Sequence, residues 1–370
     1  MRFPEFSGEW ENTLLNCYLE ENKERNKKGL FTKNDVLSVS GDYGVVNQIE
    51  LLGRSFAGKS VLDYHVVRSG NIVYTKSPLK EYPYGIVKVN DGIDGIVSTL
   101  YAVYTVKENA DGKFIENYFG LPSRANRYFK PIVRIGAKHD MKIGNDEVLA
   151  NHVIFPRLDE QKRISDFISL LDQRIATQRK IIEKYESLIK GLYHSVFNQP
   201  ASVLQLKDVV SVVKGKQVNG DALLEEGKFY VMNGGTEPSG YLDEYNTPAN
   251  TISISEGGNS CGYVQYNTEP FWSGGHCYSL IHKEKDINYQ YLYHFLKYKE
   301  RDIMALRIGS GLPNVQKKDL ERFEIRVLPT EQQNRVTEIL QDVSAKCDLE
   351  KRILQGWQCQ KVFLLRNLFI

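Results

Sequence analysis

One stretch of the 370-residue chain has the spacing of a phosphate-binding loop. "GRSFAGKS" at 53–60 fits G-x-x-x-x-G-K-[ST], in which main-chain N–H groups and a lysine surround phosphate oxygens. Such a loop lies between a buried strand and a helix that opens at the Lys-Ser pair. The preceding "GVVNQIELL" is too polar for a central strand, and no strand ending in Asp follows. A solvated loop is the favoured interpretation, and a P-loop NTPase stays open as an alternative.

Other reactive patterns give little support for catalysis. Carboxylate–x–Lys triplets such as Glu21-Asn22-Lys23 occur, but patterns this short arise by chance. The chain has no Asn/Asp-Pro-Pro-aromatic stretch to hold a flipped adenine, and no glycine-rich cofactor turn after a strand. Its histidines are single, and its cysteines lack zinc spacing, which predicts reduced thiols: Cys17, Cys261, Cys277, Cys347 and Cys359. We expect a non-catalytic chain that itself binds no cofactor and no metal.

The composition is that of a soluble globular protein, with 25% charged and 41% apolar residues. No run of about 18 apolar residues occurs, so we expect a cytoplasmic protein without a membrane span. The net charge is only +2, and residues 199–328 carry 14 basic and 16 acidic side chains. Any nucleic-acid interface must therefore come from the segregation of charge in space.

Two long helices are predicted from a repeat. "LDEQKRISDFISLLDQRI" at 158–175 returns as "TEQQNRVTEILQDVSAKC" at 330–347, an offset of 172 residues. Apolar residues follow a heptad a/d seam in both copies, which is typical of a coiled coil. The first seam comprises Ile164, Ile168, Leu171, Ile175, Gln178, Ile182, Tyr185, Ile189, Leu192 and Val196. The second comprises Val336, Leu340, Val343, Cys347, Glu350, Leu354, Trp357, Leu364 and Leu368.

The polar seam residues Gln178 and Glu350 stand in the same register, either to fix the pairing or as tolerated surface positions. If the second helix packs along the first, it must run back along it, so the pair is antiparallel. Each helix packing on its own domain is the alternative, although the strict 3.5-residue period favours pairing.

The globular segments repeat as well. "NIVYTK" (71–76) matches "TISISE" (251–256), "YGIVKVN" (84–90) matches "CGYVQYN" (261–267), and "STLYAVYTV" (98–106) matches "GHCYSLIHK" (275–283). Helical stretches follow at 116–129 and 288–306, and "RIG" recurs at Arg134 and Arg307. The frames agree while the loops differ, which suits two related scaffolds that bind different targets.

These features together resemble a known family over essentially the whole chain. The opening "FPEFSGEW", the "P…EQ…I" helix starts, the paired helices and "GSGLPNVQKKDLERFEIRVLP" (309–329) are similar to the specificity (S) subunit of type I restriction–modification enzymes. The resemblance implies two target recognition domains, each reading half of a split site in double-stranded DNA. The helices would set the gap and dock two modification (methyltransferase) subunits. Those partners use S-adenosylmethionine to methylate adenine, and restriction subunits add ATP- and Mg-dependent translocation and cleavage.

The expected fold is α+β, with two similar target recognition domains joined by a pair of long antiparallel coiled-coil helices in a pseudo-two-fold arrangement. The expected domains are residues 1–155 and 199–328, and the helices are residues 156–198 and 329–370.

Polar and basic residues on the loops beside the frame are the candidates for DNA contact. Arg and Lys suit guanine or phosphate, Asn and Gln suit adenine, and a carboxylate suits the cytosine amino group. The first domain offers Lys76, Arg124, Arg127, Arg134, Lys138 and His139, and the second offers Lys214, Lys216, Gln217, Asn219, Glu256, Asn259, Arg307, Ser310, Asn314 and Lys317. Arg134 and Arg307 recur in both frames, so they could position phosphate or form a shared internal ion pair. A coiled-coil adaptor that binds only proteins is the third function that we keep open.

Overall fold

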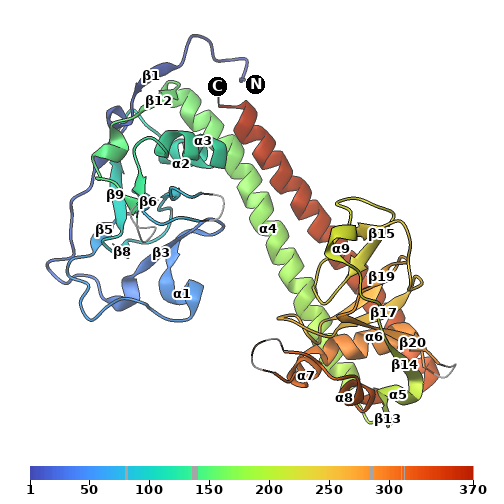
Figure 1. Ribbon diagram of the computed structural model, residues 1–370. Helices are drawn as coiled ribbons and strands as arrows, with labels where there is room; N and C mark the ends of the chain where they lie inside the picture. Colours follow the sequence, from blue (N-terminus) through green and yellow to red (C-terminus); the bar gives the residue numbers. More distant parts are fainter. Residues whose placement is uncertain (80–81, 136–140, 284–286, 310, 312, 370) are drawn as a thin grey trace. The chain divides into compact units, whose positions relative to one another are not determined.

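The structure is a computed structural model that describes residues 1–79, 82–135, 141–283, 287–309, 311 and 313–369 (Figure 1). The chain forms two compact units: residues 1–178 with 353–370, and residues 179–352. We call residues 1–155 the first module and residues 199–328 the second module. The long helices are α4 (Leu158–Phe197) and α9 (Thr330–Asn367), and each unit contains one module and one half of each helix.

In its described residues the first module combines short strands with α-helices. Its strands are β1 (Glu11–Leu14), β2 (Leu19–Glu21), β3 (Leu37–Ser40), β4 (Gly44–Asn47), β5 (His65–Val67), β6 (Ile72–Thr75), β7 (Val87–Val89), β8 (Gly95–Val97), β9 (Tyr101–Val106), β10 (Arg134–Ile135), β11 (Met141–Lys142) and β12 (His152–Phe155). Its helices are α1 (Gln48–Leu52), α2 (Gly112–Phe119) and α3 (Pro122–Phe129).

The second module has a similar make-up. Its strands are β13 (Ser202–Gln205), β14 (Val210–Lys214), β15 (Phe229–Met232), β16 (Tyr241–Leu242), β17 (Thr251–Ser255), β18 (Val264–Asn267), β19 (Trp272–Ser273), β20 (Cys277–His282) and β21 (Glu324–Val327). Its helices are α5 (Leu206–Val209), α6 (Tyr289–Tyr298), α7 (Glu300–Ala305) and α8 (Lys317–Glu321).

A four-stranded antiparallel sheet lies at the centre of each module, and the two sheets have the same topology. The strand order is β2-β9-β6-β7 in the first module and β14-β20-β17-β18 in the second. The predicted frame segments are therefore equivalent strands. A further antiparallel pair joins the first and last strands of each module, β1 with β12 and β13 with β21. The protein is α+β, as the sequence predicts.

The central strands of the two sheets are buried on both faces. The strands β6 and β17 are buried at every position, and α2 and α6 cover their sheets with Phe114, Phe119, Tyr291 and Phe295. Burial of a large apolar side chain contributes roughly 1.5–3 kcal/mol, so these aromatic residues are main contributors to the two cores.

The helices α4 and α9 pack side by side and antiparallel within each unit. In the first unit the Arg174 guanidinium lies over the Trp357 ring, and Lys361 pairs with Asp172 at 2.5 Å. In the second unit Lys351 pairs with Glu186 at 2.9 Å. All predicted seam residues are buried or partly buried, Gln178 and Glu350 included. The prediction of a paired antiparallel arrangement is confirmed, and separate packing of the helices is wrong.

Each long helix ends in a phenylalanine that enters a module core. Phe197, at the end of α4, packs on Tyr291, Phe295 and Tyr298 of the second module. Phe369, just after α9, packs on Phe114 and Tyr118 of the first module. The repeated sequence thus places equivalent residues in equivalent cores.

Candidate nucleic-acid interface

Predicted contact residues of the second module gather at one edge of its sheet. Lys214 ends β14, Glu256 directly follows β17, and Tyr278 lies in β20. The Glu256 Oε1 atom accepts hydrogen bonds from Lys214 Nζ at 2.7 Å and Tyr278 Oη at 3.0 Å. The Glu256 side chain is only 10% exposed, whereas that of Lys214 is 53% exposed. The buried carboxylate of Glu256 therefore holds the ammonium group of Lys214 at the surface.

The backbone of Glu256 connects two loops at the same edge. Its N–H donates to the His276 carbonyl at 2.8 Å, and its carbonyl accepts from Val315 N–H at 2.8 Å. Gly257 forms a β-bridge with Asn314. Gln217 packs against Gly275, next to His276. The predicted residues Lys214, Gln217, Glu256 and Asn314 thus contribute to one polar surface.

The remaining candidates of this module lie on exposed segments around that surface. Lys216 follows β14, and its carbonyl accepts from Trp272 Nε1 at 3.1 Å. The side chain of Asn219 accepts from Asp221 N–H at 3.4 Å, and Lys317 pairs with Glu321 at 3.6 Å. Asn259 and Arg307 are exposed, and Ser310 lies outside the described residues.

In the first module, Lys76 follows β6 as Glu256 follows β17. Lys76 Nζ donates to the Ile143 carbonyl at 3.0 Å and to Asn145 Oδ1, and burial lowers the pKa of its ammonium group. Asn145 in turn donates to Glu21 at 2.8 Å. In this conformation the ammonium group of Lys76 is used in hydrogen bonds within the first module.

Arg124 and Arg127 lie one turn apart on α3 but differ in their surroundings. Arg124 donates to the carbonyls of Tyr118 and Leu365, each at 3.0 Å, and its guanidinium lies over the Phe369 ring. Burial lowers the pKa of Arg124. It therefore fixes the end of α9, whereas the exposed Arg127 is free to face a ligand.

The recurring arginines occupy equivalent surface positions. Arg134 is exposed and pairs with Glu147 at 3.3 Å, and Arg307 is also exposed. The following residues form matching bridges, Ile135 with Met141 and Ile308 with Asn314. Surface exposure argues against a shared internal ion pair. Lys138 and His139 lie outside the described residues.

The phosphate-loop spacing at 53–60 lacks the structure that it requires. Gly53 ends the short helix α1 in a left-handed conformation, and residues 54–60 form neither helix nor strand. No helix opens at Lys59 and Ser60 within this described stretch, so nothing presents a dipole and N–H groups to a phosphate.

Sequence reasoning missed two groups of residues. His276 and Tyr278 lie beside Glu256 in the structure. The sequence pattern of their strand gave no sign of these contacts. Gln161 and Gln333 are fully buried and join each long helix to its module, and the "EQ" and "QQ" pairs at matching positions were the available signal.

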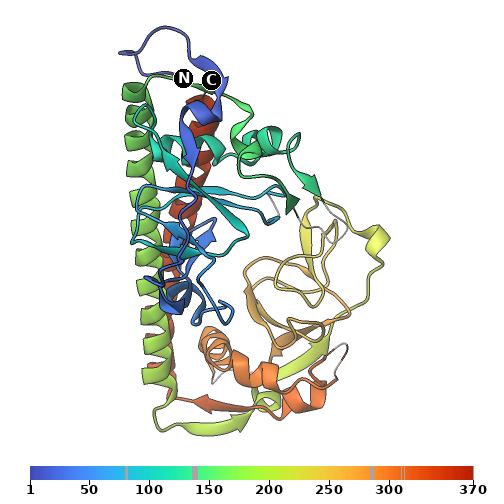
Figure 2. The same ribbon diagram turned by 90° about the vertical axis from the view of Figure 1, so that its left-hand side faces the viewer.

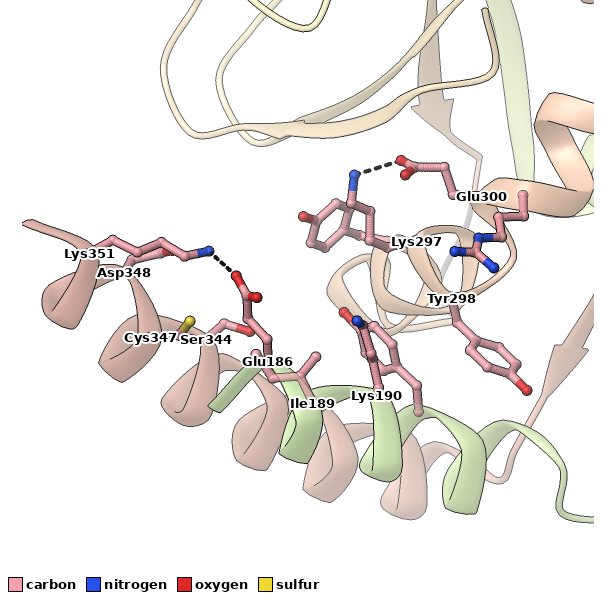
Figure 3. A pocket seen from close by; sticks show the side chains of 13 residues that line it. Glu186, Ile189, Lys190, Lys297, Tyr298, Glu300, Ser344, Cys347, Asp348 and Lys351 are labelled. Atoms are coloured by element: carbon pink, nitrogen blue, oxygen red, sulfur yellow. Dashed lines mark hydrogen bonds and ion pairs between the residues drawn. The ribbon is translucent and has the colours of Figure 1, made fainter. Parts of the chain in front are cut away.

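The second unit also contains a groove between its long helices and α6–α7, with a cavity volume of about 900 Å³ (Figure 3). Tyr193 and Tyr293 line it, and the ion pairs Lys351–Glu186 and Lys297–Glu300 lie at its sides. The corresponding pocket of the first unit measures only about 130 Å³. Tyr82 lines that pocket and donates to the Gly120 carbonyl at 2.6 Å. The segment 76–86 between β6 and β7, which carries Tyr82, is longer than its counterpart 256–263 between β17 and β18.

Comparisons with known proteins define the class of domain. Residues 198–356 match the family model described as the type I restriction modification DNA specificity domain. A protein of Mycoplasma genitalium named as a type I specificity subunit is 34% identical over 113 residues, which are 30% of this chain and 29% of that protein. One of Mycoplasma pneumoniae is 32% identical over 131 residues, 35% of each chain. The matches thus span about a third of these relatives.

The likeness of fold extends further than the likeness of sequence. The crystal structure of the S subunit of a type I restriction–modification system from M. genitalium has a TM-score of 0.70, 19% identity, and coverage of 100% of this chain and 99% of that one. A second structure, from work on complex assembly and conformational transition of the type I restriction–modification system, has a TM-score of 0.53 and 16% identity. The match covers 98% of both chains.

The resemblance to type I specificity subunits is thereby confirmed. Residues 198–356 match the model of a DNA specificity domain, and the whole chain is similar in fold to the S subunit from M. genitalium. Among the described residues no helix is long and apolar enough to cross a membrane, and none of their His, Cys, Asp and Glu side chains form a group of three that could hold a metal.

Proposed function

We propose that this chain is the non-catalytic specificity subunit of a type I restriction–modification complex and that it reads a bipartite target in double-stranded DNA. Each module reads one half-site. The supporting observation is that two modules share one sheet topology but differ in their loops, and that one of them matches a DNA specificity domain. Shared frames serve positioning, and different loops serve base recognition.

The long helices are the proposed docking surface for two modification subunits. Outside the seam between α4 and α9, several large apolar side chains of these helices remain exposed: Phe167, Leu170, Leu188, Ile339, Leu349, Ile353, Val362 and Phe363. A group of exposed apolar side chains on a pair of helices is typical of a protein–protein interface. Phe167 and Ile339 are equivalent in the repeat, which suits two copies of one partner.

The chemistry belongs to the partners in this proposal. The modification subunits would bind S-adenosylmethionine and methylate adenine, and restriction subunits would supply ATP- and Mg-dependent translocation and cleavage. The assembled complex would act in the cytoplasm as an adenine methyltransferase and endonuclease. This chain contributes recognition and geometry.

An exchange of modules tests the proposal. Residues 200–328 are replaced by the matching segment of a relative, and adenine methylation is mapped across the genome of the host. We expect one half of the methylated sequence to change while the other half and the spacer stay the same. The matched control replaces residues 11–155 and should change only the other half. If either exchange altered both halves together, the assignment of one half-site to each module would be wrong.

Two alternatives predict other results. A P-loop NTPase would bind ATP as an isolated chain, and substitution of Lys59 would abolish that binding. A protein-only adaptor would join its partners with no dependence on DNA. Duplex binding that requires the modification subunit supports the specificity subunit against both.

A further inference from the structure

One oxygen of the Glu256 carboxylate has no hydrogen-bond partner among the described residues. Oε1 is occupied by Lys214 and Tyr278, whereas Oε2 is buried and unsatisfied. A buried acceptor without a donor is unfavourable, and such exceptions in folded proteins often mark functional sites. The Glu256 carboxylate therefore retains the capacity to accept one more donor.

The exposed side chain of His276 lies beside this oxygen. His276 Nδ1 lies 3.9 Å from Glu256 Oε2, and the His276 side chain is 60% exposed. Its ring lies against Gly257, which has no side chain to restrain it. Rotation of one exposed imidazole would open Oε2 to the outside without any change in the backbone.

The surroundings suit a nucleic acid. Lys214 is bonded to Glu256, Gln217 packs against Gly275, and Asn314 pairs with Gly257. Gly257 and Gly258 directly follow Glu256, Gly274 and Gly275 directly precede His276, and a side chain added at Gly258 would project into open space. Glycines leave room for a duplex to approach the backbone closely. The ammonium group of Lys214 offsets the negative charge of the Glu256 carboxylate, which would otherwise repel the phosphates.

The equivalent position in the first module carries the opposite charge. The strand before it has the same place in the sheet, but Lys76 stands where the second module has Glu256. The side chain at this position is therefore not part of the chemistry that the two frames share. A position that served folding alone would keep its chemistry, as Gln161 and Gln333 do.

We propose that Glu256 reads a cytosine in the half-site of the second module, with Oε2 accepting a hydrogen bond from the cytosine N4 amino group after His276 turns away. Carboxylates suit this contact because N4 is a donor at the edge of the major groove. The inference rests on the proposed function, since it assigns one base contact within that recognition.

The test is Glu256→Gln in the host, with methylation mapped across the genome. A glutamine keeps the shape and the contact with Lys214, but its amide can also donate, which suits adenine. We expect the preference for cytosine at one position of one half-site to fall on the order of 10-fold, with adenine gaining most. The other half-site and the thermal stability of the purified chain should stay as in the wild type.

Controls separate base reading from support of the loops. Glu269→Gln changes an exposed carboxylate of the same module and should leave the methylated sequence unchanged. His276→Ala uncovers Oε2 and should retain the cytosine. Lys214→Ala should weaken binding of all duplexes and reduce its salt dependence, without a change of base.

The outcomes are distinguishable from failure of the proposed function. A Glu256→Gln protein that methylates the wild-type sequence less efficiently, with no base relaxed, overturns the inference and leaves Glu256 as a positioning residue. A wild-type chain that directs no methylation at all with its partner would instead count against the specificity-subunit function itself.

Discussion

Gln161 and Gln333 hold matching positions at the starts of the long helices, and each makes the same two kinds of hydrogen bond. Gln161 accepts from Asp111 N–H at 2.9 Å and donates to the Pro156 carbonyl at 2.9 Å. Gln333 accepts from Asn288 N–H and donates to the Leu328 carbonyl, both at 2.7 Å. Asp111 and Asn288 are the residues that cap α2 and α6. One glutamine thus ties the start of a long helix to the start of the helix that covers the sheet.

The first prediction concerns this contact. Gln333→Ala leaves a buried N–H and a buried carbonyl without partners, which costs about 1–3 kcal/mol. We expect the free energy of unfolding of the second unit to fall by that amount in urea titration, and Gln161→Ala to do the same in the first unit. The neighbouring Gln332 is exposed, so Gln332→Ala serves as the matched control. Equal stability of Gln333→Ala and Gln332→Ala would show that Gln333 does not stabilise the junction between α9 and α6.

The second prediction concerns pH. Burial lowers the pKa of His294 to about 4, and that of His65 in the other unit likewise. An unfolded histidine has a pKa of about 6.5, so the unfolded state takes up the proton first as pH falls. Stability is therefore complete above pH 6.5 and decreases toward pH 4, by up to about 3 kcal/mol for each histidine.

Urea unfolding of His294→Asn at about pH 7 and pH 4.5 checks this. Asparagine can still accept from Tyr193 Oη, which lies 3.0 Å from His294 Nδ1, but it does not titrate. We expect the variant to lose less stability on acidification than the wild type. The same change at the exposed His282 should leave the acid sensitivity as it was. A parallel loss in both variants would show that carboxylates cause the acid dependence.

At the scale of the elements, the third prediction uses the long helices as a spacer. A helix rises about 1.5 Å per residue, so one added heptad lengthens each by roughly 10 Å and keeps the a/d seam in register. Insertion of seven residues after Gln178 and after Glu350 should lengthen the gap between half-sites, read from the methylated sequence. Five residues inserted at the same places turn the following part of each helix by roughly 140°, so the seam is broken and activity should be lost. An unchanged gap with full activity would mean that other elements set the distance.

The elements were also the part that the sequence predicted best. Heptads and alternating strands are local patterns, and their repetition at a fixed offset doubled the signal for α4, α9 and the frame strands β6, β9, β17 and β20. The candidate contacts were harder, because type and loop position do not say which donors are already used. Arg124 binds the end of a helix that lies far along the chain, and Lys76 binds the loop at 143–145. Only tertiary structure reveals such partners.

At the scale of the whole molecule, the last prediction concerns the closed order of module, helix, module, helix. The Met1 amine donates to the Asn367 carbonyl at 2.7 Å, and Figures 1 and 2 both show the start of the chain beside the end of α9. Arg2 makes a bidentate pair with Glu160 at 2.6–2.7 Å, so the first residues are held on α4. Chain ends that lie close together tolerate being joined.

A permutant that links Ile370 to Met1 and opens the chain at 198–201 should therefore keep every contact described above. Residues 198–200 are exposed and lie between α4 and β13, so the cut removes no core packing. We expect the permutant to bind its modification subunit and to direct methylation to the same split site. A control permutant opened between Ser253 and Ile254 interrupts a buried strand and should not fold. If the first permutant were insoluble while the separate halves of the chain remained soluble, or if it folded but did not bind the partner, the closed antiparallel arrangement would not be what the partner recognises.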